Sequence, residues 1–565
     1  MDERAYSYDP VPGAPVSNRR NMEAGQLWRQ YIIAGIANIA IASTGYSMGW
    51  TSPVNIKLKD ANLTDSPLPA PITTDEESWI GSLLTVGAIL GPFIGGPLAA
   101  RIGRKWTLLL CSVPLFAGWI LVAAATAVAF LYAGRIMWGI GVGMLFTVSP
   151  MYCAEIATND SRGALGSFLQ MFITLGFLLV YGIGPFVSYS VIAYVGVAFV
   201  AVFDVAFFFM PESPIYHLTK NNRESAAECL MTIRGKSRSG VEAELDLMAS
   251  DVAASMAKTA TIRDVFRGSN FKAFYISCAL VFFQQFCGIN AVLFYMTNIF
   301  EAAGSDLDSS IATIIIGAVQ VGASCVTPFV VDRLGRRLLL LFSACGTAIG
   351  LALLGMFFLL DDLGSPVVDS IGFLPILSLV VFIVTYCVGL GPLPWAVMGE
   401  LFPIEVKSAA APIATAFCWA LSFLVTKYFG PISEAVGMYV AFWIFGVCCV
   451  VAFFFTLFVV PETKGKIAPI KKNRVRVGLE HAFMHIYSRG QVRTNSIYMN
   501  RWPLTQNGSQ VVTSYRMTQR GKALNKIDQR SDLDLGSRLK RAALDRSLWS
   551  SLGEVFVQQW SSLIG

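Results

Sequence analysis

Twelve apolar stretches recur along the chain, each about 20 residues long, the length that a helix needs to cross a bilayer. Only 14% of the residues are charged and the mean hydropathy is +0.57, values that exclude a soluble domain of this size. The sequence therefore predicts an all-α membrane protein with twelve transmembrane helices. They are expected near residues 29–50, 77–98, 106–127, 129–150, 163–186, 189–210, 271–294, 309–331, 338–360, 371–395, 408–430 and 434–460.

Charge and polarity predict how the chain lies in the membrane. Residues 1–28 are polar and lack the apolar core of a signal peptide, so the first helix is expected to direct insertion. Cytosolic loops carry an excess of Lys and Arg, and the loops with "ARIGRK" and "DRLGRR" are the most basic. We therefore expect both termini of this multi-pass protein to lie in the cytosol. The plasma membrane is the expected location, and intracellular vesicles are the alternative. Asp75, Glu77 and Lys427 then fall on the outer side with the sequon at Asn62, a candidate glycosylation site.

The two halves of the chain repeat four features in the same order. Each half has a Gly-Arg loop, a Glu, a basic residue seven positions later, and a Pro-Glu pair. These are "ARIGRK" (100–105), Glu155, Arg162 and "PES" (211–213) in the first half, and "DRLGRR" (332–337), Glu400, Lys407 and "PET" (461–463) in the second. The repeat predicts two pseudo-symmetric six-helix bundles, a design that allows a central site to open alternately to either side.

The repeat also predicts the domain organisation. A polar segment over 211–270 separates the bundles and is expected to form short cytosolic helices. The expected domains are a cytosolic segment over 1–28, bundles over 29–210 and 271–460 on either side of that linker, and a tail over 461–565.

At this level of detail the chain resembles a known family. "GYSMGWTSP", "EESWIGSL", "PESPIYHL", "QQFCGINAVLFY", "GLGPLPWAVMGELFP" and "PETKGK" resemble motifs of the major facilitator superfamily sugar transporters. The likeness extends over roughly residues 26–466 and is strongest to insect facilitated trehalose transporters and animal class III glucose transporters. It implies the major facilitator fold and a sugar substrate.

Polar side chains within the apolar spans are the candidate sugar-binding residues. Amides offer donors and acceptors without the cost of burying a charge, so they can replace the water around a sugar. Gln284, Gln285 and Asn290 match the family's sugar-binding motif on the seventh helix. By the same resemblance, the other candidate ligands are Gln170, Gln320, Trp395 and Trp419. The alternative is that these amides only tie helices together.

Two further sets of residues resemble the family's gates. Phe294 and Tyr295 resemble an aromatic pair at the outer gate. Gly391, Pro392 and Pro394 are expected to break the tenth helix and let it bend during gating, or else to form a static kink.

Charged residues at the cytosolic helix ends resemble the family's inner salt-bridge clusters. These are Arg104, Glu155 and Arg162 in the first half and Arg336, Glu400 and Lys407 in the second. Such pairs are expected to join the bundles or neighbouring helices when the outer side is open. The arginines also act as topology determinants in either case.

The first helix indicates that transport is not coupled to protons. Proton-driven relatives carry an Asp in a "GYD" sequence, whereas this chain has Ser47 there, and a hydroxyl does not titrate near neutral pH. Facilitated uniport of trehalose is the leading hypothesis. A hexose carrier and a non-transporting sugar sensor that signals through its tail are the alternatives. No catalytic constellation, cofactor motif or metal-ligand spacing is present, so we do not expect an enzyme.

The C-terminal tail is strongly basic. Residues 464–565 contain 18 Lys and Arg against 6 Asp and Glu. The tail is expected to be largely disordered and to lie against anionic lipids, with a possible amphipathic helix over 531–564. An alternative chain end without function is the other interpretation. Nothing in it indicates a nucleic-acid partner.

Overall fold

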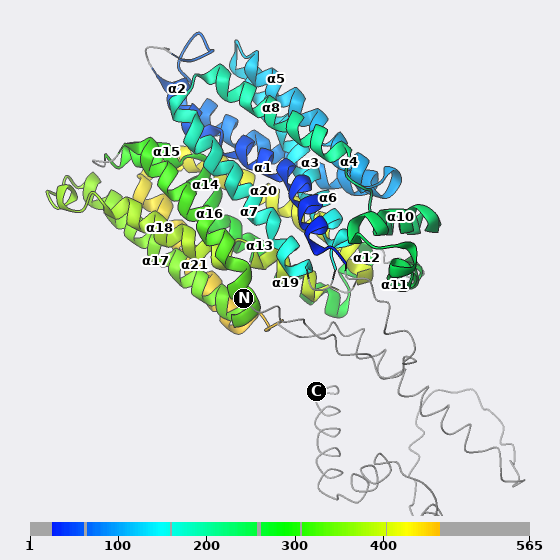
Figure 1. Cartoon of the computed structure of the whole chain (residues 1–565). Coiled ribbons are helices and arrows are strands. Elements are labelled where there is room, and N and C mark those ends of the chain that lie inside the picture. Colours follow the sequence, from blue (N-terminus) through cyan, green and yellow to red (C-terminus); the bar gives the residue numbers. More distant parts are fainter. Residues whose placement is uncertain are drawn as a thin grey trace, which may run out of the picture. The chain divides into compact units, whose positions relative to one another are not determined.

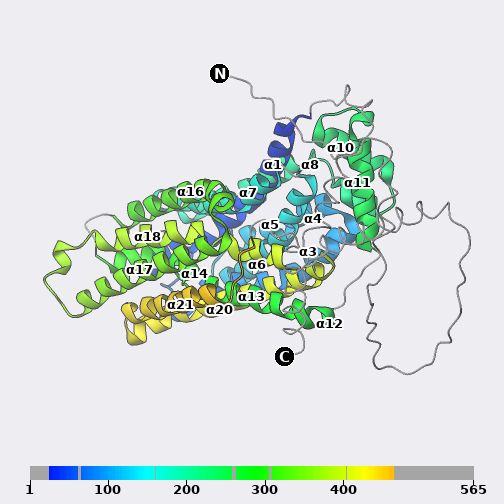
Figure 2. The same ribbon diagram turned by 90° about the horizontal axis from the view of Figure 1, so that it is seen from below.

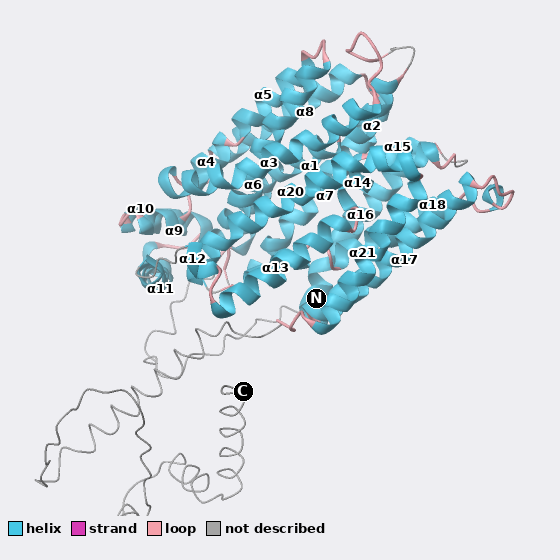
Figure 3. Ribbon diagram, turned by 180° about the vertical axis from the view of Figure 1, so that it is seen from behind, coloured by secondary structure: helices cyan, strands magenta, loops and turns pink. Residues whose placement is uncertain are grey.

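The computed structural model describes residues 25–60, 65–158, 161–256, 262–304, 308–402 and 404–463. Within these ranges the regular secondary structure is helical, as Figure 3 shows. Twelve helical segments there are long and apolar enough to cross a membrane, so the predicted number of spans is confirmed. The sequon at Asn62 and the basic tail from residue 464 lie outside the described residues, and so does the proposed helix over 531–564.

The first half supplies six of these segments, two of which are divided into shorter helices (Figure 1). In chain order they are α1 (Leu27–Gly49) with α2 (Thr51–Lys59), α3 (Thr74–Ile102), α4 (Arg104–Leu110) with α5 (Ser112–Ala123), α6 (Val128–Ile156), α7 (Arg162–Ile183) and α8 (Tyr189–Phe208).

The second half supplies the other six. They are α13 (Gly268–Phe286) with α14 (Ile289–Phe294), α16 (Ser309–Leu334), α17 (Arg336–Asp362), α18 (Leu374–Val388) with α19 (Leu393–Leu401), α20 (Ile404–Val436) and α21 (Met438–Phe458); α15 (Met296–Ala302) follows α14.

Four helices of the described chain connect the halves and lie at one end of the helical bundle (Figure 2 and Figure 3). They are α9 (Pro214–Thr219), α10 (Arg223–Arg234), α11 (Arg238–Met256) and α12 (Ile262–Val265). Arg234 of α10 is buried and donates to the carbonyl of Ile156 at the end of α6, at 2.7 Å. We call this end of the bundle the linker end.

Close helix packing holds each half together, and two helix pairs join the halves. A Cβ atom on Gly139 of α6 would lie 2.0 Å from the carbonyl oxygen of Leu84 on α3, so only glycine allows this approach. Between the halves, α3 packs against α20 and α7 packs against α16. These two pairs make the most extensive contacts between the halves, and smaller contacts of α2 with α14 and α15 add to the interface.

Two helices are interrupted where the chain carries glycine or proline. The break predicted in the tenth span is present, because α18 ends at Val388 and α19 begins at Leu393. The seventh span was expected to be continuous, but it is interrupted between α13 and α14, where Gly288 has a φ of +82°. Gln284 and Gln285 therefore lie on one side of a break and Asn290 on the other.

The eleventh span is longer than expected. It continues through Pro431 to Val436, and α21 begins at Met438 instead of residue 434. Lys427, which was expected among the outer charges, lies within α20 and is only 8% exposed. Pro431 lies inside this helix without ending it, although it lacks the N–H that would donate to the carbonyl of Lys427 four residues earlier.

Replacing Gly288 by alanine is expected to destabilise the protein by about 1–3 kcal/mol, since a positive φ is strained for any residue with a Cβ. The new Cβ would also lie 2.4 Å from the ring of Phe445. Thermal unfolding of the detergent-purified protein measures this loss. Gly322→Ala on α16 is the matched control, because its Cβ would meet nothing within 4 Å. Equal unfolding temperatures for the two variants would contradict the prediction.

Candidate functional site

The side-chain amide of Gln284 donates hydrogen bonds to backbone carbonyls at the break in the tenth span. Its Nε2 donates to the carbonyl oxygens of Leu390 at 3.0 Å and Gly391 at 2.6 Å. In a continuous helix the Leu390 carbonyl would accept from residue 394, but Pro394 has no N–H. The proline thus frees an acceptor, and Gln284 from another helix satisfies it.

Gln285 and Asn290 form a second set of contacts across α13, α14 and α20. Asn290 Nδ2 donates to Gln285 Oε1 at 2.5 Å and to Ser422 Oγ at 2.7 Å, and Gln285 Nε2 donates to Cys418 Sγ at 3.0 Å. Gln285 and Asn290 are 6% and 7% exposed. The polar side chains of three helices therefore meet in one buried chain of hydrogen bonds.

Three candidate residues each keep a buried polar atom without a hydrogen-bond partner among the described residues. These atoms are Gln284 Oε1, Gln320 Oε1 and Trp419 Nε1. Leaving such an atom unpaired costs about 1–3 kcal/mol, which a bound polar molecule can recover. Two acceptors and one donor are thus free for a ligand that both donates and accepts hydrogen bonds.

One of the two aromatic candidates, Trp419, lies where the halves approach each other. The ring of Trp419 on α20 packs edge-on against Phe146 of α6, with the ring centroids 5.4 Å apart. Trp395 on α19 is half-buried, as is Gln170 on α7. Candidate residues therefore come from both halves, although the second half contributes most of them.

Phe294 and Tyr295 both contact the first half. Phe294 is fully buried, and its ring centroid lies 5.8 Å from the guanidinium carbon of Arg135 on α6. The Tyr295 hydroxyl donates to the carbonyl of Thr426 at 3.3 Å and lies so close to α3 that a Cβ on Gly81 would be 2.6 Å from it. The two aromatic residues therefore fill the space between α3, α6 and α20, and their role as a gate stays a prediction.

Arg135 was not anticipated as a functional residue. It is fully buried and donates to three backbone carbonyls, those of Ile80 at 2.7 Å, Ser47 at 2.8 Å and Gly81 at 3.1 Å. A lone arginine in the apolar run of residues 129–150 was the available signal, because a charge in a span is costly and usually functional. It ties α6 to α1 and α3 beside Phe294.

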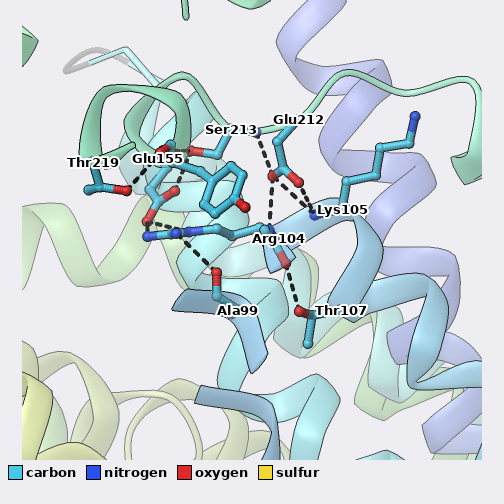
Figure 4. Close-up of polar contacts among 10 residues, drawn as sticks. Ala99, Arg104, Lys105, Thr107, Glu155, Glu212, Ser213 and Thr219 are labelled. Atoms are coloured by element: carbon cyan, nitrogen blue, oxygen red, sulfur yellow. Dashed lines mark hydrogen bonds and ion pairs between the residues drawn. The ribbon is translucent and has the colours of Figure 1, made fainter. Parts of the chain in front are cut away.

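Figure 4 shows the first cluster of charges at the linker end. Arg104 Nη2 and Glu155 Oε1 are 2.8 Å apart, and Glu155 Oε2 accepts from the hydroxyl of Ser213. The carboxylate of Glu212 accepts from the backbone N–H groups of Arg104 at 2.9 Å and Lys105 at 3.0 Å. The cluster therefore fixes the start of α4 to the ends of α6 and α8.

The second half repeats this arrangement. Arg336 Nη2 and Glu400 Oε1 are 3.0 Å apart, and the carboxylate of Glu462 accepts from the N–H groups of Arg336 at 3.0 Å and Arg337 at 3.1 Å. In contrast to the first cluster, Glu400 Oε2 and Thr463 Oγ1 are buried without a partner in the described part of the chain. The sequence repeat is thus also a repeat of contacts. Each ion pair joins helices of a single half, the first pair in the first half and the second pair in the second.

One predicted member, Arg162, is not brought into the first cluster. Arg162 instead lines a cavity of about 120 Å³ between α1, α6 and α7, together with Asn38 and Leu169. The side chain of Lys407 lies outside the described residues. Pairing of either residue with a Glu stays a prediction.

Two similar six-helix halves around a polar centre define a transporter of the major facilitator superfamily. The solved structures agree. The xylose transporter XylE from E. coli in a partially occluded inward open conformation matches with a TM-score of 0.65 at 25% identity, over 78% of this chain and all of that chain. A structure of XylE described as a proton:xylose symporter, bound to 6-bromo-6-deoxy-D-glucose, matches equally well, with a TM-score of 0.65 over 97% of that chain.

Within that superfamily, the chain belongs to the sugar (and other) transporter family, whose profile matches residues 28–468. The facilitated trehalose transporter Tret1 of Anopheles gambiae is 36% identical over 442 residues, or 78% of this chain and 55% of that protein. Tret1 of Culex quinquefasciatus is 36% identical over 77% of this chain and 84% of that protein. The chain spans about half the length of several of the curated relatives it matches.

Proposed function

We propose that this protein carries a sugar, most readily trehalose, across the membrane down its concentration gradient by alternating access. The observation that carries the proposal is that Gln284 and Gln320 each keep a buried amide oxygen without a partner among the described residues, while Gln285 and Asn290 form a buried chain of hydrogen bonds with α20. Each sugar hydroxyl both donates and accepts, so it matches these free groups, and Trp419 and Trp395 provide apolar ring faces for the C–H surfaces.

The choice of trehalose is supported by the names of the relatives. Several proteins 36% identical to this chain are named facilitated trehalose transporters. A hexose is the second candidate, because XylE was solved with a glucose derivative.

The proposal that transport is uncoupled is supported by the surroundings of Ser47. Its hydroxyl donates to the carbonyl of Thr44 at 2.9 Å, and its own carbonyl accepts from Arg135 at 2.8 Å. A group that exchanges a driving proton must titrate, which a hydroxyl does not do near neutral pH. The solved relative XylE, in contrast, is named a proton:xylose symporter.

For the orientation, we propose that the linker end faces the cytosol and that the protein resides in the plasma membrane with both termini inside. The basic loops beside α4 and α17 support this orientation. Contact of the basic tail with anionic lipids and a glycan at Asn62 belong to the same proposal.

Uptake of labelled trehalose and of labelled glucose by cells expressing the chain tests the proposed substrate. Saturable trehalose uptake that exceeds glucose uptake is expected, and the reverse order would favour the hexose carrier. A chain truncated after Lys466 is expected to keep its flux, since the candidate site lies in α7, α13, α14, α16, α19 and α20. A sensor would show little flux in either form.

A further inference from the structure

At the end away from the linker, one lysine of the second half is held by residues of the first half. Lys427 of α20 donates through Nζ to Asp75 Oδ1 at 2.6 Å and to Ser78 Oγ at 2.7 Å. The same Nζ lies 4.2 Å from the ring centroid of Trp79. Asp75, Ser78 and Trp79 all belong to the first two turns of α3. We call these four residues the outer latch.

The helix start that carries the outer latch is itself well fixed. Thr73 caps α3, because its hydroxyl accepts from the N–H of Glu76 at 3.2 Å while the Glu76 carboxylate accepts from the N–H of Thr73 at 2.8 Å. This capping box sets the direction in which Asp75 and Ser78 point. The partners of Lys427 are thus presented by a rigid helix turn.

The outer latch lies next to the aromatic residues between the halves. Thr426, the residue before Lys427, accepts the hydroxyl of Tyr295 through its carbonyl. Further contacts between the halves surround it: Asn298 of α15 donates to the buried carboxylate of Glu77 at 3.0 Å, and Ser52 of α2 and Thr297 of α15 join hydroxyls at 2.7 Å. The contacts around Lys427 therefore belong to a closed end of the interface.

These contacts stabilise the protein only while this end of the interface is closed. A buried ammonium needs hydrogen-bond partners, and among the described residues Lys427 takes its two hydrogen bonds and its aromatic contact from the opposite half. If α3 and α20 separate, all three contacts are lost together. An interaction made in one of two conformations shifts the equilibrium towards that conformation.

We propose that Lys427 is a gate residue that holds the end away from the linker closed, and that sugar enters or leaves at this end only after the ammonium has left Asp75, Ser78 and Trp79. This inference rests on the proposed function in two respects: that the substrate is a sugar, and that the end away from the linker faces the outside of the cell. The gating contact itself stands on the geometry of α3 and α20.

The chain offers a matched ion pair that does not join the halves. Lys59 of α2 and Glu77 of α3 are 2.5 Å apart at the same end, but both belong to the first half. Neutralising Lys59 removes a lysine–carboxylate pair without removing a contact between α3 and α20. Lys59→Met is therefore the control for Lys427→Met, which keeps most of the aliphatic chain over Trp79 and removes the charge.

The experiment measures access to the closed interface from outside the cell. Thr426→Cys places a thiol at a fully buried position beside Lys427, and a membrane-impermeant maleimide reports its exposure, with the chain lacking this substitution as background. Adding Lys427→Met is expected to speed labelling about tenfold, equivalent to about 1.4 kcal/mol, while Lys59→Met leaves the rate within about twofold. The exchange of charges in Asp75→Lys with Lys427→Asp is expected to restore slow labelling.

Three results overturn the gate: an unchanged labelling rate in Lys427→Met, the same acceleration in Lys59→Met, or continued fast labelling after the charge exchange. A general loss of folding would accelerate labelling in Lys427→Met but would not be reversed by the exchange. Sugar flux is measured in the same cells. Predicted labelling without flux in the parent chain would uphold the gate and reject the transport proposal, whereas flux with unchanged labelling would do the opposite.

Discussion

A chain carrying Gln285→Leu together with Asn290→Ala is expected to lose saturable trehalose flux by at least about 100-fold. The substitutions remove the hydrogen bonds that join α13, α14 and α20, together with the amides that we propose replace the water around the sugar. A hundredfold loss corresponds to about 2.7 kcal/mol, the scale of two or three lost hydrogen bonds. Initial uptake of labelled trehalose into sealed vesicles measures the effect.

Gln30→Leu separates loss of a sugar ligand from loss of a structural tie. Gln30 is 1% exposed, and its Oε1 accepts from Ser161 Oγ at 2.8 Å and from the N–H of Thr158 at 3.1 Å, all within the first half. This variant is expected to unfold at a lower temperature but to retain saturable flux. If the double variant kept its flux, or if both variants lost stability and flux alike, the amides would be ties and the site would lie elsewhere.

Glu155→Gln is expected to cost about 3 kcal/mol of stability, because it leaves the largely buried guanidinium of Arg104 without a carboxylate. The side chains of Arg104 and Glu155 are each 11% exposed, so water cannot replace the lost charge. Thermal unfolding of the purified protein measures the loss. A fall in unfolding temperature by several degrees is expected.

The equivalent change in the second half, Glu400→Gln, provides the comparison. The Glu400 side chain is 30% exposed, and screening by water reduces what its pair with Arg336 contributes to about 1 kcal/mol. The first cluster should thus be the more sensitive of two otherwise repeated arrangements. Equal losses in the two variants would mean that burial does not set the strength of these pairs.

The sequence predicted those features that depend on local composition. Apolar runs predicted the twelve spans, because length and hydropathy alone decide whether a helix can cross a bilayer. The cluster of glycine and proline before Trp395 predicted the break between α18 and α19. The pairing of Arg104 with Glu155 and of Arg336 with Glu400 was implied by the resemblance to the family's inner salt-bridge clusters.

Features that depend on tertiary contacts were not predicted. A single Gly288 in an apolar run does not by itself indicate a helix break, and the sequence shows neither its positive φ nor its close approach to the ring of Phe445. Arg135 bonds to backbone carbonyls, which leave no pattern in the sequence. The sequence predicted Glu77 and Lys427 as charges on the outer side, but both are buried where α3 packs against the second half. Because both residues lie at the interface between the halves, they are candidates for closing the end away from the linker.

We propose that one sugar site opens alternately to either side of the membrane without a driving proton. Counterflow measures this directly. Vesicles preloaded with unlabelled trehalose are diluted into labelled trehalose, with and without a protonophore. We expect labelled trehalose to accumulate transiently inside the vesicles above its equilibrium level, to the same extent with and without the protonophore. Entry of label without such an overshoot, or an overshoot that disappears with the protonophore, would contradict it.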